Sequence, residues 1–158
     1  MTPVLVTPPA QPVITLAEAK AHLRVDIDAE DSLIEGMVAA ATAHLDGWRG
    51  VLGRAIMPQA WRETHDGAGP FVLALPDVTA VTASAGGAAT ITATPTGPVV
   101  ELAEAVDGVT LTYTCALPPE VLPSAQMAVK LFLSHLYDQT DLSPAFDAIV
   151  GALRWSGV

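Results

Sequence analysis

The sequence of 158 residues has one cysteine, few basic residues and few aromatic residues. A lone cysteine, Cys115, excludes an internal disulfide framework and a zinc site built from several cysteines. Seven Lys and Arg against seventeen Asp and Glu give a formal charge of −10. This charge makes binding of duplex DNA by the chain unfavourable, because phosphate binding requires basic side chains that displace counterions.

Long hydrophobic runs are also missing. The longest apolar stretch, around residues 127–133, is interrupted by Lys130 and is far shorter than the roughly 20 residues that span a bilayer. The N-terminus carries four prolines and no basic segment, so it lacks the pattern of a signal peptide. We therefore expect a soluble, unprocessed chain with no membrane contact.

Motifs for catalysis or metal binding are equally scarce. The sequence has no HExxH pair, GxSxG elbow, P-loop or GxGxxG turn. The acidic residues 26–31 invite comparison with a calcium loop, but an EF-hand that starts at Asp26 needs glycine at its sixth position and glutamate at its twelfth. Asp31 and Met37 occupy those positions. We predict no catalytic residue, no metal site and no cofactor, and we do not expect an enzyme.

What the sequence does contain begins with a helical pair over residues 15–50. Thr15 and Glu18 have the spacing of a capping box, which predicts a helix start at Thr15. After the acidic joint, apolar residues recur at the three-and-four spacing of an amphipathic helix: Leu33, Ile34, Met37, Val38, Ala41, Leu45 and Trp48. Glycines 47 and 50 mark the expected end of this second helix.

Residues 60–115 have the pattern of antiparallel strands. Short β-branched runs are separated by turn signals, at a spacing of roughly ten residues and with no helix between them. The expected strands cover 60–64, 71–75, 78–85, 88–94, 99–102 and 109–114. In the last of these runs, threonines alternate with apolar residues, which predicts one buried and one solvent-facing side.

Helical patterns return over residues 122–158. An apolar stripe follows Ser124, which we expect to cap a long helix. A last helix is expected from Pro144 to Trp155, with Ser143 as its cap and Pro144 at the first helical position. The four prolines of residues 1–13 predict an extended arm. The whole chain, residues 1–158, is thus predicted to be one α+β domain, mainly a helical bundle of about four helices with a β-rich antiparallel insertion in the middle.

The order of these parts also supports a comparison with a known family. The informative segments are LAEAKAHLRVDIDAEDSLIEGMVAAATAHLDGW (16–48), AIMPQAW (55–61), LALPDVTAV (73–81) and LPSAQMAVKLFLSHLYDQ (122–139). In this order they resemble the phage head–tail connector (adaptor) family, which also occurs in gene transfer agents. The sequence departs from the family after the late helix, where DQTDLSPAF stands in place of the basic residues that family members often have.

The resemblance implies a structural adaptor of a tailed phage or gene transfer agent particle. Such proteins form a ring, commonly of twelve subunits, that joins the portal to the stopper or tail and lets DNA pass through its lumen without specific binding. The implied partners are the portal protein, stopper or tail proteins, and other copies of the same chain. The implied location is the head–tail interface of the particle, after assembly in the bacterial cytoplasm.

The C-terminal segment supplies the candidate contacts with the portal. In the family this segment tends to engage the portal, and Arg and Trp are residue types enriched in interface hot spots. The candidates are Phe146, Ile149, Val150, Leu153, Arg154 and Trp155. The alternative is that this segment forms a helix packed on its own domain.

Two further functions remain open at this point. The chain has the size of a stopper or tail-completion protein of the same particle, one level further from the capsid. From a different class, a small hydrolase or ligand-binding domain would place its site between the helical pair and the sheet, although the sequence offers no convergent polar group there. For a connector, the net charge suggests an acidic lumen to which DNA adheres weakly.

Overall fold

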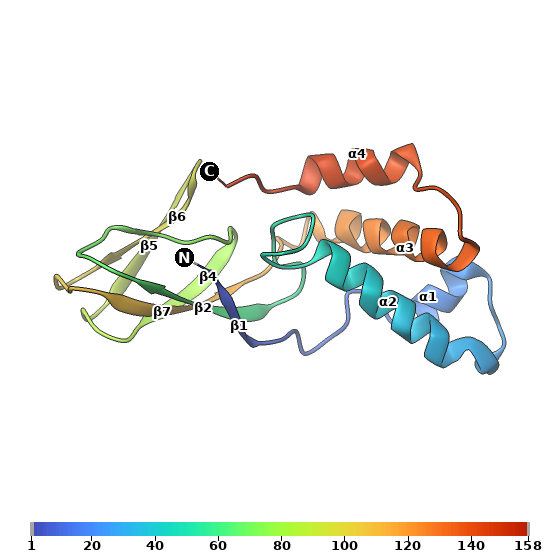
Figure 1. Ribbon diagram of the computed structural model, residues 1–158, viewed down its shortest axis with the longest axis horizontal. Helices are drawn as coiled ribbons and strands as arrows, with labels where there is room; N and C mark the ends of the chain where they lie inside the picture. The colour runs from blue at the N-terminus through green and yellow to red at the C-terminus, as the bar shows by residue number, and fades with distance from the viewer. Residues whose placement is uncertain (1, 158) are drawn as a thin grey trace.

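Helices and strands gather at opposite ends of an elongated molecule (Figure 1). The computed structural model describes residues 2–157. The first residue of the predicted arm and the last residue of the predicted C-terminal segment therefore lie outside the described residues. The two ends have separate hydrophobic cores, so each type of secondary structure buries its own apolar faces.

The helical end contains two pairs of helices that are far apart in the sequence. They are α1 (Leu16–Leu23), a short 3₁₀ turn η1 (Asp28–Glu30), α2 (Asp31–Leu45), α3 (Leu122–Asp138) and α4 (Pro144–Leu153). The predicted capping box is confirmed: the Thr15 hydroxyl accepts from the backbone N–H of Glu18 at 3.2 Å, and Thr15 N–H donates to the Glu18 carboxylate at 2.8 Å.

Proline and serine residues lie at the starts of α3 and α4. Ser143 caps α4 as predicted, because its hydroxyl accepts from the N–H of Phe146 at 3.3 Å. The predicted cap at Ser124 is wrong, since α3 already begins at Leu122. Pro123 lies in the first turn of α3, where its missing N–H leaves no hydrogen bond unmade.

The helical core is formed where the apolar faces of α1 to α4 meet. Ile34 and Leu45 of α2 and Leu133 of α3 are fully buried in it. Val13 and Ile14, just before α1, are also buried there. Most residues of the predicted apolar stripes face one common core, but Leu33 is exposed and Trp48 lies beyond the end of α2 and is also exposed.

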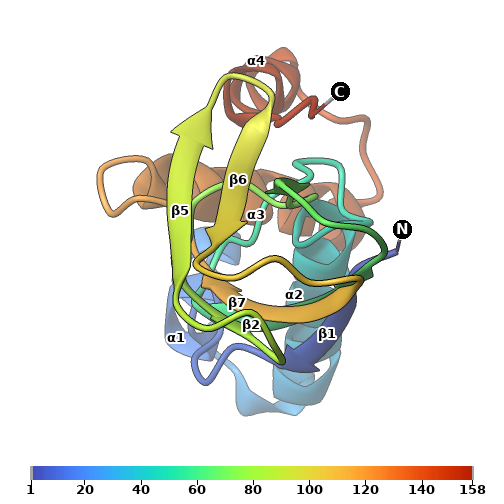
Figure 2. The same cartoon turned by 90° about the vertical axis from the view of Figure 1, so that its left-hand side faces the viewer.

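The β end consists of two antiparallel sheets (Figure 2). The first has the order β1-β2-β7-β4, and the second has the order β3-β6-β5. The strands are β1 (Val4–Thr7), β2 (Gln59–His65), β3 (Phe71–Val72), β4 (Val78–Ala83), β5 (Ala89–Thr94), β6 (Gly97–Leu102) and β7 (Val109–Cys115). Every pairing is antiparallel, as the hairpin-like spacing predicts.

Alternation along the strands separates the β core from solvent. In β7, Leu111 and Tyr113 are buried, while the alternating Thr110, Thr112 and Thr114 are partly exposed. The predicted alternation of this strand is confirmed. Trp61 of β2 and Val100 of β6 lie in the same core, so the two sheets bury their inner faces against each other.

The α+β class is confirmed, but the description as mainly a helical bundle fits only loosely. The β end has a core of its own and contains seven strands within the described residues. One of them, β1, lies in the segment predicted as an extended arm and pairs with β2. No helix in the described part of the chain is long and apolar enough to cross a bilayer.

Cys115 provides a test of the β core. The thiol is fully buried, and burial, reinforced by the nearby Asp77 carboxylate, raises the pKa of Cys115 to about 12. Because the thiolate is the reactive form, we expect no modification of the native protein by a thiol reagent at about pH 8, and full modification in urea. Mass spectrometry measures both, and rapid labelling of the native chain would contradict the described core.

Candidate functional site

Residues 46–58, here called the junction loop, connect the two cores. The loop leaves α2 and enters β2. Its side chains are divided between the two ends, because Leu52 and Ile56 belong to the helical core and Ala55 belongs to the β core. The position of any surface on one end relative to the other therefore depends on this loop.

A partly buried polar contact closes the junction loop at its base. Oδ1 of Asp46 accepts the backbone N–H of Ile56 at 2.7 Å, and both carboxylate oxygens accept from Gln59 Nε2 at 3.0 Å. Burial raises the pKa of the Asp46 carboxyl, and these hydrogen bonds oppose the rise. The contact joins the end of α2 to the start of β2.

Arg54 makes the second fixed contact of the junction loop. Its Nε and Nη2 donate to the two oxygens of Asp77 at 2.8 and 2.9 Å, in the bidentate arrangement. Its Nη1 donates to the carbonyl of Leu153 at 3.1 Å. One side chain thereby connects the loop to the residue before β4 and to the last residue of α4.

The predicted portal-contact residues divide into two groups. Phe146, Val150 and Leu153 are buried in the helical core, which is the packing of α4 on its own domain that the sequence left as an alternative. Ile149 and Trp155 are half-buried, and Arg154 is exposed. The backbone N–H of Trp155 donates to the Leu52 carbonyl at 2.7 Å, so the end of α4 is held against the junction loop.

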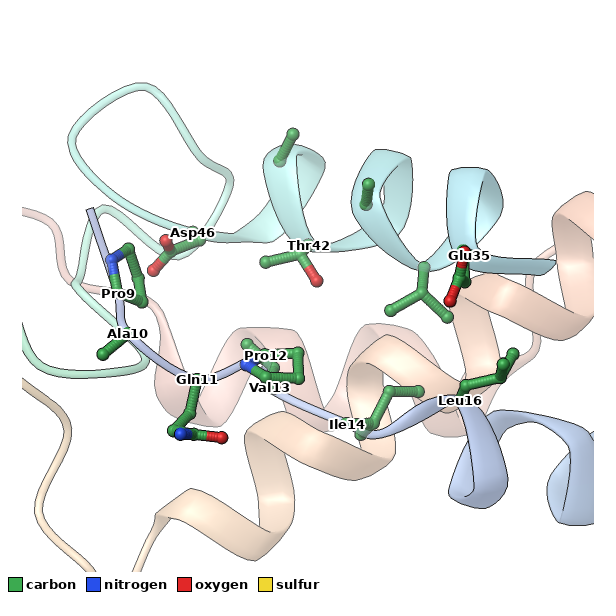
Figure 3. Close-up of a pocket in the computed structure, with 13 residues that line it drawn as sticks. Pro9, Ala10, Gln11, Pro12, Val13, Ile14, Leu16, Glu35, Thr42 and Asp46 are labelled. Atoms are coloured by element: carbon green, nitrogen blue, oxygen red, sulfur yellow. The ribbon is translucent and has the colours of Figure 1, made fainter. Parts of the chain in front are cut away.

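An open apolar groove runs between α2 and the chain segment that precedes α1 (Figure 3). Its volume is about 660 Å³. Pro9, Pro12 and Leu16 line one side, and Val38 and Thr42 of α2 lie on the other. The lining is mostly apolar, with Glu35 and Asp46 as its charged members, and it offers room for a side chain or extended segment of another protein.

A second cavity, of about 550 Å³, lies beside the β core and has a polar lining that includes Glu63 and His65. Glu63 is buried and accepts from the Tyr113 hydroxyl and from the Ala74 N–H at 3.1 Å. Burial is the larger cause, and the hydrogen bond to Glu63 the second, of a raised pKa of the Tyr113 hydroxyl. His65 Nε2 lies 3.2 Å from Glu63 Oε2 without a well-aligned hydrogen bond. Thr96 supplies a hydroxyl to the lining, and its Oγ1 lies 3.0 Å from Thr94 Oγ1.

The acidic joint between α1 and α2 is held by contacts within the chain. Lys20 Nζ lies 2.9 Å from Asp28 and 2.7 Å from Asp31. Hydrogen bonding and charge attraction from Lys20 lower the pKa of Asp28, and Glu30 accepts from the Tyr137 hydroxyl at 2.5 Å. Among residues 2–157, no group of three or more His, Cys, Asp or Glu is placed to hold a metal ion.

The contacts of Arg54 at the junction loop could not be predicted from the sequence. Arg54 and Asp77 are 23 residues apart, and Arg54 and Leu153 are 99 residues apart. Neither pair has a periodic pattern or a motif that would connect it. An Asp before a strand and an Arg in a glycine-containing loop are ordinary features, and only the folded chain brings them together.

The Arg54 contact yields a stability test. Replacing Arg54 by Ala leaves the mostly buried Asp77 carboxylate without its partner, so we expect the free energy of unfolding to fall by about 3 kcal/mol. Arg49→Ala is the matched control, because Arg49 lies in the same loop but is exposed; it should change stability by less than about 0.5 kcal/mol. Urea unfolding measures both. Equal effects of the two substitutions would contradict the role assigned to Arg54.

Comparisons with known proteins agree with this architecture. Residues 13–66 match the family model of the phage gp6-like head-tail connector proteins. No curated protein matches the chain. Among solved structures, a chain in the neck of an empty GTA particle, computed with C6 symmetry, has a TM-score of 0.74 and 20% sequence identity, over 100% of this chain and 97% of that chain.

The two matches concern different properties of the chain. The family model covers the segment from just before α1 to the end of β2, including the whole junction loop. At 20% identity, the structural match demonstrates a shared fold from end to end. The family-model match over residues 13–66 confirms the resemblance seen in the sequence.

Proposed function

We propose that this chain is a structural adaptor of a tailed phage or gene transfer agent particle. In this proposal, copies of the chain form a ring that joins the portal to the stopper or tail, and DNA passes through the lumen. The observation that carries the proposal is the connector-family match over residues 13–66. That match covers the first helical pair, the junction loop and β2, which together set the positions of the two ends.

The charge of the chain supports passage of DNA without binding. With a formal charge of −10, copies arranged in a ring repel the phosphate backbone on average, so a strand that moves through the lumen meets few attractive contacts. Two of the seven basic side chains, Lys20 and Arg54, are already engaged by carboxylates of the same chain.

The exposed end of α4 and the residues after it form the proposed portal contact. Phe146, Val150 and Leu153 hold α4 on the helical core. Arg154 is exposed and Trp155 is half-buried, while the half-buried Ile149 packs at the margin of the same core. The anchoring of Leu153 by Arg54 and of Trp155 by Leu52 gives this surface a fixed orientation, which lowers the ordering cost of binding.

A stopper or tail-completion protein of the same particle is the second candidate. The structural match is to a chain in the neck of a particle. A position in the neck is compatible with a stopper as well as with an adaptor. Binding to the portal separates the two functions. Cross-linking in particles that captures tail components and never the portal would support the second candidate.

The portal contact is tested by a charge-reversal variant. We expect Ile149→Asp combined with Arg154→Glu to weaken binding to the portal protein of the same particle at least about tenfold, because both changes place negative charge on the proposed surface. The binding titration is made well below the melting temperature, which should fall for this variant because the half-buried Ile149 packs against the helical core. Co-purification and a binding titration provide the measurements.

Met127→Asp provides the matched control for this experiment. Met127 is a 44% exposed apolar residue on α3 and is not one of the candidate portal contacts. Portal binding should survive this substitution. Undiminished binding of the Ile149 and Arg154 variant would remove the tail from the interface. Deleting residues 144–158 is a poorer test, because it would also remove three buried residues from the helical core.

A further inference from the structure

The outer edge of β1 is open and apolar. β1 is an end strand of its sheet and pairs only with β2. Val4, Leu5 and Val6 are 51%, 43% and 46% exposed, and no charged residue lies in the strand. Edge strands of soluble proteins are usually protected by charged residues or covered, because their free N–H and C=O groups can pair with another chain.

The opposite end of the same sheet has similar properties. β4 pairs only with β7, and its sequence, VTAVTA, also lacks charge. Thr79, Ala80 and Thr82 are exposed. Ten edge residues without a single charge are therefore available on a chain with a net charge of −10. A second copy can approach these edges without the like-charge repulsion that disfavours other copy-to-copy contacts.

We propose that β1 of one copy pairs with β4 of the next copy, so that the four-stranded sheet continues from subunit to subunit. The two edges differ, so the contact is heterologous, and each added copy leaves one free edge of each kind. Such a contact generates a ring when the rotation between copies closes. The inference rests on the proposed ring function and deepens it by naming the contact between subunits.

The side chains on the solvent face fit this continuation. The strand register places Val4 opposite Arg62, Arg62 opposite Thr112, and Thr112 opposite Thr82, so these residues form one row across the sheet. An added strand extends this row with small, uncharged neighbours on both sides of the contact. Arg62 is its only charged member, and it lies inside the row rather than at either end.

The size of the contact predicts weak pairing between isolated copies. β1 has four residues, and one short strand buries less than the roughly 1,200 Å² of a stable standard-size interface. In a closed ring every subunit makes two such contacts, and they act together. We therefore expect isolated chains to associate only weakly, which makes covalent trapping the suitable measurement.

Disulfide trapping tests the pairing directly. Side chains of adjacent strands have Cβ atoms about 4.5–5.5 Å apart, close to the spacing that a disulfide requires. The test uses Val4→Cys combined with Ala80→Cys, and separately Val4→Cys combined with Thr82→Cys to allow for register. Under mild oxidation of the concentrated protein, at least one double variant should give a ladder of oligomers beyond the dimer. The buried Cys115 should not take part.

Single variants and mixtures establish the direction of the contact. Val4→Cys alone and Ala80→Cys or Thr82→Cys alone should stay monomeric on a non-reducing gel. The corresponding equimolar mixture should stop at the dimer, because each pair of copies then has one complete contact. Val4→Cys combined with Thr92→Cys is the matched control, since Thr92 is an exposed, uncharged residue of β5 in the other sheet; it should give no ladder.

Several results would overturn the inference. Dimers from Val4→Cys alone would demonstrate a symmetric β1–β1 contact, and a ladder with Thr92→Cys would move the partner edge to β5. Absence of ladders from both double variants, while the wild-type chain binds the portal, would exclude the β1–β4 contact and leave the proposed function intact. A ladder from a chain that fails to bind the portal would instead contradict the portal-joining function alone.

Discussion

The bidentate contact between Arg54 and Asp77 is the constraint on which the arrangement of the two ends depends. Each core is held together by its own apolar side chains, but such packing does not orient one end relative to the other. Arg54 supplies that orientation, because its guanidinium also donates to the carbonyl of Leu153. The planar guanidinium fixes both the direction and the distance between Arg54 and Asp77. Apolar contacts are not directional in this way.

The second connection between the ends reinforces this orientation. The N–H of Leu117, between β7 and α3, donates to the carbonyl of Ala55 at 2.8 Å, so the chain returning to the helical end is hydrogen-bonded to the junction loop. Asp46 closes the same loop at its base. An adaptor that contacts one partner through α4 and its neighbours through the sheet edges needs these surfaces at fixed mutual positions, and the junction loop provides them.

Local features of the fold could be predicted from the sequence, because short-range chemistry determines them. The Thr15 capping box, the Ser143 cap and the alternation in β7 each depend on residues within a few positions of one another. The strand β1 could not be predicted, because VLVT between prolines has the composition of an extended arm and becomes a strand only through β2. An apolar stripe such as that of α4 does not reveal whether it packs on its own core or on a partner. Half of the candidate portal contacts are therefore in the core.

We propose that the chain forms the ring between portal and tail, and electron microscopy of tailed particles is the decisive test of this proposal. We expect density below the portal to fit this fold in a ring, with the end of α4 toward the portal and β1 of each copy beside β4 of the next. A ring at that position formed by a different chain, with this protein absent from the head–tail interface, would contradict it.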